Sequence, residues 1–167
     1  MIKSTFNIYL LILYTALTSI SISSIAQTTL PTTISTDYTL SKINSPYRVV
    51  SNVSVTAGAK LTVEPGVVVE FYEDAGLYVE GCVSMKGDAE DWIYLKTAPG
   101  HVNWGAITFE YTSDPSIMQY VEITGSTHGK DANRDRAAVN ASFVAEVILD
   151  HVRIFNVASA VYFIDTN

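Results

Sequence analysis

The sequence is poor in cysteine and in positive charge. Cys82 is the single cysteine among 167 residues, which excludes an internal disulfide framework and any cysteine-rich zinc site. Ten lysine and arginine residues stand against seventeen aspartate and glutamate residues, giving a formal net charge of −7. Because phosphate backbones are bound by basic surfaces, this balance argues against nucleic acid as a partner.

Two short sequence signals are also missing. Neither Asn-Gly nor Asp-Gly occurs, although these pairs form the tight turns of antiparallel hairpins. Thr-x-Thr, which an ice-binding β-helix would display in a flat array, is absent as well. Hydrophobic residues nevertheless make up 48% of the chain and charged residues only 16%, which is enough apolar material for one packed domain.

Residues 1–26 have the pattern of a secretory signal peptide. Lys3 precedes an apolar run over 8–17, and Ser24-Ile25-Ala26 fits cleavage after Ala26. The alternative is a transmembrane anchor, although threonine and serine dilute the stretch. No cysteine lies near the cleavage point, which disfavours a lipoprotein. We therefore expect a secreted or cell-envelope, extracytoplasmic protein with no transmembrane anchor in the mature chain.

Short runs that alternate apolar and polar residues dominate the rest of the chain, and no helical period appears. Residues 27–45 are rich in threonine and serine and are expected to be a leader or an N-terminal cap, followed by one domain over 46–167. Within that domain the runs follow a repeating cycle of three, which we call sides A, B and C. Side A carries Val55, Leu77, Val79, Ile107, Phe109, Val161 and Phe163, with a less regular strand near 138–143; side B carries Val63, Met85, Met118 and Leu149; side C carries Phe71, Leu95, Ile123 and Ile154.

The period of this cycle predicts a solenoid. Successive side C residues are 24, 28 and 31 positions apart, within the range of repeat architectures. Three short strands per period without a helix indicate a parallel β-helix, in which each strand pairs with its equivalent one coil later. The alternative is an antiparallel sandwich, which would not need to preserve the cycle. We expect an all-β, right-handed parallel β-helix solenoid of about four coils, from about Pro46 to the C-terminus.

Several segments resemble a known family. They are Leu61–Phe71, Gly76–Gly81, Met85–Gly87, Trp104–Ile107 and Leu149–Ile154. They are similar to the pectin-lyase-like right-handed β-helix modules of large bacterial surface proteins, which occur beside spore-coat-kinase-like or lamin-tail domains. The resemblance implies a cell-surface module, and many such modules have no known catalysis.

Two insertions lengthen the later coils at one corner. Thr97–Asn103 and Thr127–Arg136 both leave the solenoid between side C and side A, on successive coils. Stacked insertions on one face of a solenoid commonly build its binding face. The candidate patch consists of Tyr72, Glu73, Asp74, His101, Asn103, Trp104, His128, Lys130, Asp131, Asn133, Arg134, Asp135 and Arg136. An aromatic ring beside mixed polar groups suits a sugar or a peptide; the alternative is a solvated loop without a ligand.

The Asp-x-Asn-x-Asp spacing at 131–135 imitates the first half of a calcium loop. An EF-hand requires glycine and glutamate where this chain has Arg136 and Ser142, so an EF-hand is excluded. A looser calcium site shared with Glu73 or Asp74 stays open. Otherwise no cofactor is expected.

The sequence favours binding or scaffolding over catalysis. Glu80, Glu110 and Glu122 are expected to point outward and could line a shallow groove. We expect a module of a larger adhesin-like or carbohydrate-associated protein, with a polysaccharide or a surface protein as its partner. The alternative is a polysaccharide lyase or glycoside hydrolase of the pectin-lyase-like class.

Two further features concern the surface of the chain. The strand at Val161-x-Phe163 is followed by no capping segment, so we expect a piece of a longer protein or a subunit that self-associates through its open last coil. Asn52-Val53-Ser54 and Asn140-Ala141-Ser142 match the glycosylation sequon, which matters only in a eukaryotic source.

Overall fold

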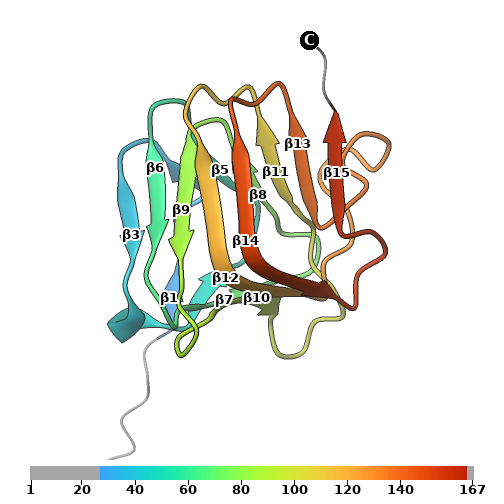
Figure 1. The fold of residues 1–167 in the computed structure, drawn as a ribbon. Helices are drawn as coiled ribbons and strands as arrows, with labels where there is room; N and C mark the ends of the chain where they lie inside the picture. Colours follow the sequence, from blue (N-terminus) through green and yellow to red (C-terminus); the bar gives the residue numbers. More distant parts are fainter. Residues whose placement is uncertain (1–26, 165–167) are drawn as a thin grey trace, which may run out of the picture.

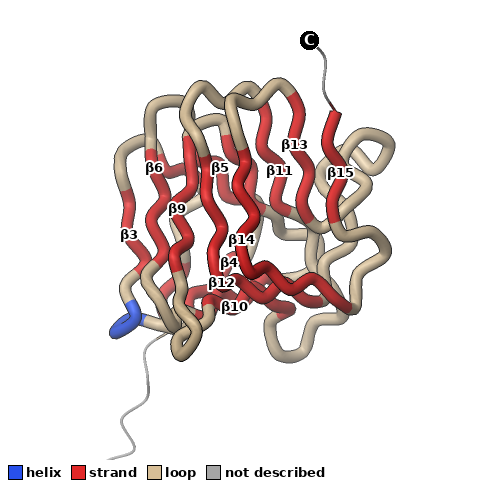
Figure 2. The backbone as a smooth tube through the Cα atoms, viewed as in Figure 1, coloured by secondary structure: helices blue, strands red, loops and turns tan. Residues whose placement is uncertain are grey.

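The computed structural model describes residues 27–164 (Figure 2), and all strand pairs in this range are parallel (Figure 1). Residues 1–26, predicted to be a signal peptide, lie outside the described part. Within residues 27–164, one short 3-10 helix, η1 (Lys42–Asn44), accompanies fifteen strands. The parallel pairing excludes the antiparallel sandwich. The chain is an all-β solenoid of parallel strands.

The strands stack on three sides, as the sequence cycle predicts. Side A holds β2 (Thr33–Ile34), β5 (Val53–Val55), β8 (Leu77–Val79), β11 (Ile107–Glu110), β13 (Val139–Ser142) and β15 (Val161–Ile164). Side B holds β3 (Tyr38–Leu40), β6 (Lys60–Val63), β9 (Cys82–Lys86) and the first halves of β12 (Ser116–Thr124) and β14 (Val147–Phe155). Side C holds β1 (Thr28–Thr29), β4 (Tyr47–Val49), β7 (Val68–Phe71), β10 (Ile93–Thr97) and the second halves of β12 and β14.

The register confirms most of the predicted stacking. On side B, Met85 pairs with Val63 and with Met118, and Met118 pairs with Leu149. On side C, Ile123 pairs with Leu95 and with Ile154, as expected.

One predicted pair on side C is wrong. Phe71 lies opposite Thr97, and Val69 is the residue that pairs with Leu95. Both Val69 and Phe71 point inward and are buried. Because the side-chain pattern of a strand repeats every two residues, it cannot distinguish registers that differ by two.

Residues 27–45 differ from the expected leader or cap. Strands β1, β2 and β3 pair in parallel with β4, β5 and β6, so this segment supplies strands to a coil ahead of those predicted from Pro46. Leu30, Ile34 and Leu40 join the buried core. Threonine and serine fill the outward and corner positions of these short strands, which hid the alternation in the sequence.

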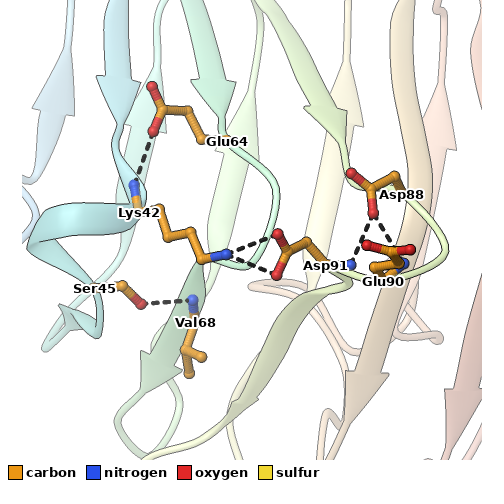
Figure 3. A network of polar contacts seen from close by, with 7 residues as sticks. All are labelled: Lys42, Ser45, Glu64, Val68, Asp88, Glu90 and Asp91. Carbon is orange, nitrogen blue, oxygen red and sulfur yellow. Dashed lines mark hydrogen bonds and ion pairs between the residues drawn. The ribbon is translucent and has the colours of Figure 1, made fainter.

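Polar contacts connect one corner across successive coils (Figure 3). The backbone N–H of Lys42 donates to Glu64 Oε2 at 2.9 Å, and its Nζ lies 2.7 Å from Asp91 Oδ1. These partners belong to the next two turns between sides B and C, after β6 and after β9. The amide of Val68 donates to Ser45 Oγ at 2.9 Å. Because the two contacts of Lys42 are exposed and the bond of Val68 is part-buried, we expect them to align the corner more than to stabilise it.

The two ends of the solenoid are covered unequally. In the first coil Leu40 is 1% exposed, whereas Phe163 in the last strand is 52% exposed. Leu149, Val152 and Ile154 of β14 are only partly buried. The last coil therefore presents apolar side chains to solvent.

Candidate binding groove

The outward face of side A carries one polar or aromatic side chain from each coil. The register places Ser54 beside Tyr78, and Tyr78 beside Thr108. The row continues through Asn140 to Tyr162. These positions alternate with the inward residues, because successive side chains of a strand point to opposite faces.

Two adjoining hollows follow this row, and we call them together the side-A groove. Their volumes are about 290 Å³ and about 500 Å³. They share Tyr78, Thr108, Glu110 and Lys130. The linings are completed by Asn52, Ser54, Val79 and Glu80 in the first hollow, and by Asp131, Ala132, Arg134 and Asp135 in the second.

The second insertion closes over the groove because its base is fixed to the preceding coil. Ser126 Oγ donates to the carbonyl of Gly105 at 2.6 Å, and Thr127 Oγ1 donates to the carbonyl of Trp104 at 2.9 Å. Gly129 then passes close to the sheet. A Cβ at this position would lie 2.7 Å from Thr108 Oγ1, so a larger residue would lift the loop.

The groove has an excess of negative charge. Glu80, Glu110, Asp131 and Asp135 line it, against the two cations Lys130 and Arg134. Arg134 Nη2 lies 2.7 Å from Glu110 Oε1, and the field of this carboxylate raises the pKa of Arg134. The groove therefore suits an uncharged or cationic ligand better than a polyanion.

Tyr78 is the aromatic side chain shared by both hollows. Burial, and then the negative charge of Asp135, raises the pKa of Tyr78 to about 12. Its hydroxyl is therefore protonated at physiological pH and is both a donor and an acceptor. A ring with a neutral hydroxyl can stack on a sugar and hydrogen-bond to it.

The Asp-x-Asn-x-Asp segment forms a compact turn through its own backbone. Asp131 Oδ1 accepts from the Asn133 N–H at 2.9 Å, and Asp135 Oδ2 accepts from the Asp131 N–H at 3.1 Å. One oxygen of each carboxylate therefore accepts a backbone N–H and holds the turn in shape. Across residues 27–164, no group of three or more His, Cys, Asp or Glu residues is placed to hold a metal ion.

The first insertion forms a separate cluster. The ring of His101 lies 4.2 Å from the ring of Tyr72, and His101 Nδ1 accepts from the Glu73 N–H at 3.3 Å. Arg48 Nη1 donates to the Tyr72 hydroxyl at 3.0 Å. In the described part of the chain, the lining of the side-A groove contains no residue of this cluster. The predicted patch thus divides into two sites.

Trp104 is not a surface aromatic. It is 0% exposed, its ring stacks on Phe71 with centroids 4.1 Å apart, and its Nε1 donates to the carbonyl of Thr124 at 2.8 Å. A fully buried indole cannot stack on a ligand at the surface. The prediction of Trp104 as a binding residue is therefore wrong, and the residue belongs to the core.

The remaining predicted residues lie around these two sites. Asp74 and His128 are exposed, and Asn103 is half-buried. His128 Nδ1 lies 2.9 Å from the carbonyl of Gly129. Arg136 Nε donates to the carbonyl of Asn133 at 2.7 Å. These contacts hold the loop together, and none of these four residues lines the groove.

Sequence reasoning missed the centre of the groove. Tyr78 lies between the inward residues Leu77 and Val79 of side A, and Thr108 lies between Ile107 and Phe109. The two-residue alternation could therefore have placed both side chains on the outward face. Glu80 and Glu110 point outward into the groove, as expected. Glu122 lies on side C instead, where its Oε2 is 3.8 Å from Arg153 Nη1.

A search for membrane-crossing helices among residues 27–164 finds none of sufficient length and hydrophobicity.

Comparison with known proteins gives one partial similarity. No family model matches the chain, and no solved structure matches it. The chain is similar to Protein bark beetle of Drosophila melanogaster, with 35% identity over 71 residues. This stretch is 42% of the chain and 2% of that protein, so the chain spans only a small part of the length of this relative.

Proposed function

We propose that the chain is an extracytoplasmic, non-catalytic module that binds carbohydrate in the side-A groove, within a larger adhesin-like or carbohydrate-associated protein. The observation that carries the proposal is the groove itself, with Tyr78 and Thr108 on its floor and the 127–136 loop at its edge. Aromatic and polar groups gathered in a concave site are typical of small-molecule and sugar recognition.

The fold is part of the proposal. We infer a right-handed parallel β-helix of the pectin-lyase-like kind. The parallel three-sided stacking supports this inference, since parallel strands joined by crossovers are almost always right-handed. As part of this inference, we assign the four coils predicted from about Pro46 to β5–β7, β8–β10, β11–β12 and β13–β14, with β15 after them.

The charge of the groove narrows the ligand class. Four carboxylates against two cations repel an acidic polyuronate and tolerate an uncharged glycan. We therefore propose a neutral polysaccharide as the ligand. This charge balance also weighs against a lyase acting on acidic pectin-like chains.

A glycan array followed by titration calorimetry tests the proposal. Wild-type protein is expected to bind neutral polysaccharides and not polyuronates, and Tyr78→Ala is expected to weaken binding at least tenfold. Tyr94→Ala is the matched control, because Tyr94 is outward-facing and 38% exposed on side C. Equal binding by wild type and Tyr78→Ala, or a preference for polyuronates, would contradict the proposal.

The alternative function is a glycoside hydrolase. Glu80 and Glu110 follow paired residues on adjacent coils and line the same hollow, and hydrolysis needs two carboxylates about 5–9.5 Å apart. A turnover assay on the bound glycans, with and without calcium, separates the two functions. If the wild-type protein forms product and Glu80→Gln or Glu110→Gln abolishes it, the protein is a glycoside hydrolase and the non-catalytic proposal is wrong.

A further inference from the structure

The two glycosylation sequons lie in different environments. Asn52 is exposed in the turn between β4 and β5, whereas Asn140 is 3% exposed on β13. In an Asn-x-Ser sequon the oligosaccharide is attached to the side-chain amide nitrogen of asparagine. The modification therefore requires this nitrogen to face open space in the folded product.

The side chain of Asn52 meets this requirement. Its Oδ1 accepts the N–H of Gly76 at 3.0 Å, which fixes the amide group by its oxygen. The nitrogen is not used by this bond. Ser54, which completes the sequon, is half-buried on the same outward face, and both residues line the groove.

The side chain of Asn140 does not meet it. Its Oδ1 accepts the Ala137 N–H at 3.0 Å, and its Nδ2 donates to the Ala137 carbonyl at 2.8 Å. A glycan on this nitrogen would have to pass through packed structure, because Ala137 is also buried. Glycosylation of Asn140 is thus incompatible with this fold.

We infer that Asn52 is an N-glycosylation site and that Asn140 stays unmodified in the folded protein. The donor is an oligosaccharide linked to a lipid diphosphate. A bond forms between Asn52 Nδ2 and the anomeric carbon, and the bond from that carbon to the diphosphate oxygen breaks. The amide loses one proton, the lipid diphosphate leaves, and nothing is oxidised or reduced.

The inference also depends on entry into the secretory pathway, through the predicted signal peptide. The insect-cell host of the test below supplies this donor. The inference does not depend on the proposed function, since the glycan is detected by mass whether or not the groove binds a ligand.

A glycan at Asn52 would restrict the groove at one end. Asn52 lines only the hollow nearer β5, whereas the loop residues Asp131, Ala132, Arg134 and Asp135 line only the other one. A ligand would then enter from the side of the loop. The glycosylated protein and its enzymatically deglycosylated form are expected to differ in affinity for long chains and not for short ones.

The test is secretion of the full chain from cultured insect cells. Intact mass is measured before and after peptide-N-glycosidase F, and the sites are located by peptide mapping in heavy-oxygen water. Wild type is expected to carry one glycan, at Asn52. Asn52→Gln and Ser54→Ala are each expected to remove it, and Ser54→Ala does so without changing the acceptor asparagine.

The folding of each secreted variant is checked by circular dichroism and thermal unfolding. Asn140→Gln is expected to keep the single glycan while lowering stability, because it disturbs the two bonds to Ala137. An unmodified Asn52 in the wild-type protein, a chain that does not enter the secretory pathway, or a glycan on Asn140 of folded protein would each overturn the inference.

Discussion

Trp104 joins three successive coils at the corner between sides C and A. Its ring stacks on Phe71 of the coil before, and its Nε1 and backbone N–H donate to Thr124 and Gly125 of the coil after. The insertion at 97–103 precedes it, which made the residue look like part of a polar loop in the sequence. At a corner the two-residue alternation stops, so the sequence pattern does not say which side chains turn inward.

Replacing Trp104 is expected to destabilise the fold and not to act on binding alone. Trp104→Ala removes a fully buried indole and leaves a cavity, which costs about 3–5 kcal/mol in the free energy of unfolding. Denaturant titration followed by circular dichroism measures this loss. Val102→Ala, two residues earlier and 82% exposed, is the control and should stay within about 0.5 kcal/mol of wild type. A Trp104→Ala protein as stable as this control would contradict the packing described above.

Tyr78 is expected to make stability fall at high pH. The folded pKa of about 12 lies above the ordinary tyrosine pKa of 10.0, so between these values the folded state holds a proton that the unfolded state has lost. The free energy of unfolding therefore decreases as pH rises from about 10 to 12. Spectrophotometric titration of the phenolate should show one tyrosine that ionises late, and Tyr78→Phe should remove that component. If the late-ionising component persists in Tyr78→Phe, it belongs to another tyrosine and the assignment to Tyr78 is wrong.

Glycine and aromatic residues both adopt left-handed backbone conformations at the corners of the solenoid. Gly58 and Gly66 adopt φ values of 80° and 75°, as expected for turn glycines. The later coils place aromatic residues in the same left-handed region. Tyr111 and Phe143, with φ of 56° and 54°, stack with ring centroids 5.1 Å apart. Such φ values cost free energy in residues other than glycine, and the stacking of equivalent corners offsets part of that cost.

Gly81 is expected to be required for the close packing of adjacent coils, whereas Gly58 is expected to matter only for its backbone conformation. A Cβ on Gly81 would lie 2.1 Å from the carbonyl oxygen of Ala59, in the backbone of the preceding coil. Gly81→Ala should therefore separate the coils and cost about 3 kcal/mol. Gly58→Ala meets nothing within 4 Å and is strained only by its φ of 80°, so about 1 kcal/mol is expected. Thermal unfolding of the two variants measures the difference, and equal losses would show that coil spacing does not depend on Gly81.

The element-level stacking was largely predictable, and the course of the loops was not. The three sides followed from the period of the inward residues, and side B matched residue by residue. The strand at 139–142 was less regular in the sequence because Asn140 is a buried polar residue whose amide bonds to Ala137. The 127–136 loop folds over side A through contacts to Gly105 and Trp104, which lie far away in the sequence. Local patterns carry no signal for such contacts.

At the scale of the molecule, the apolar end of the solenoid is expected to mediate self-association. Phe155 and Phe163 are 45% and 52% exposed, and β14 and β15 pair with no further strand in the described part of the chain. Open edges of this kind pair readily with another chain. Light scattering of residues 27–167 should show a mass that grows with concentration.

A charge on the last strand is expected to suppress this association. Phe163→Glu places a carboxylate on the open coil, and Val102→Glu places one on an exposed loop elsewhere, as a control. The first variant should shift the mass toward the monomer, and the second should not. A wild-type protein that stays monomeric at high concentration would show that the last coil needs no partner.

The contacts of Trp104 also bear on how the molecule responds to force. If the chain is pulled at residue 164, β15, β14 and β13 would detach in turn, because within residues 27–164 the strands β14 and β15 each pair on one side only. Further extension has to remove β12, and with it the bond from the Trp104 indole to Thr124. Because the Trp104 indole is fully buried, this step would need more force than the detachment of the partly buried β14.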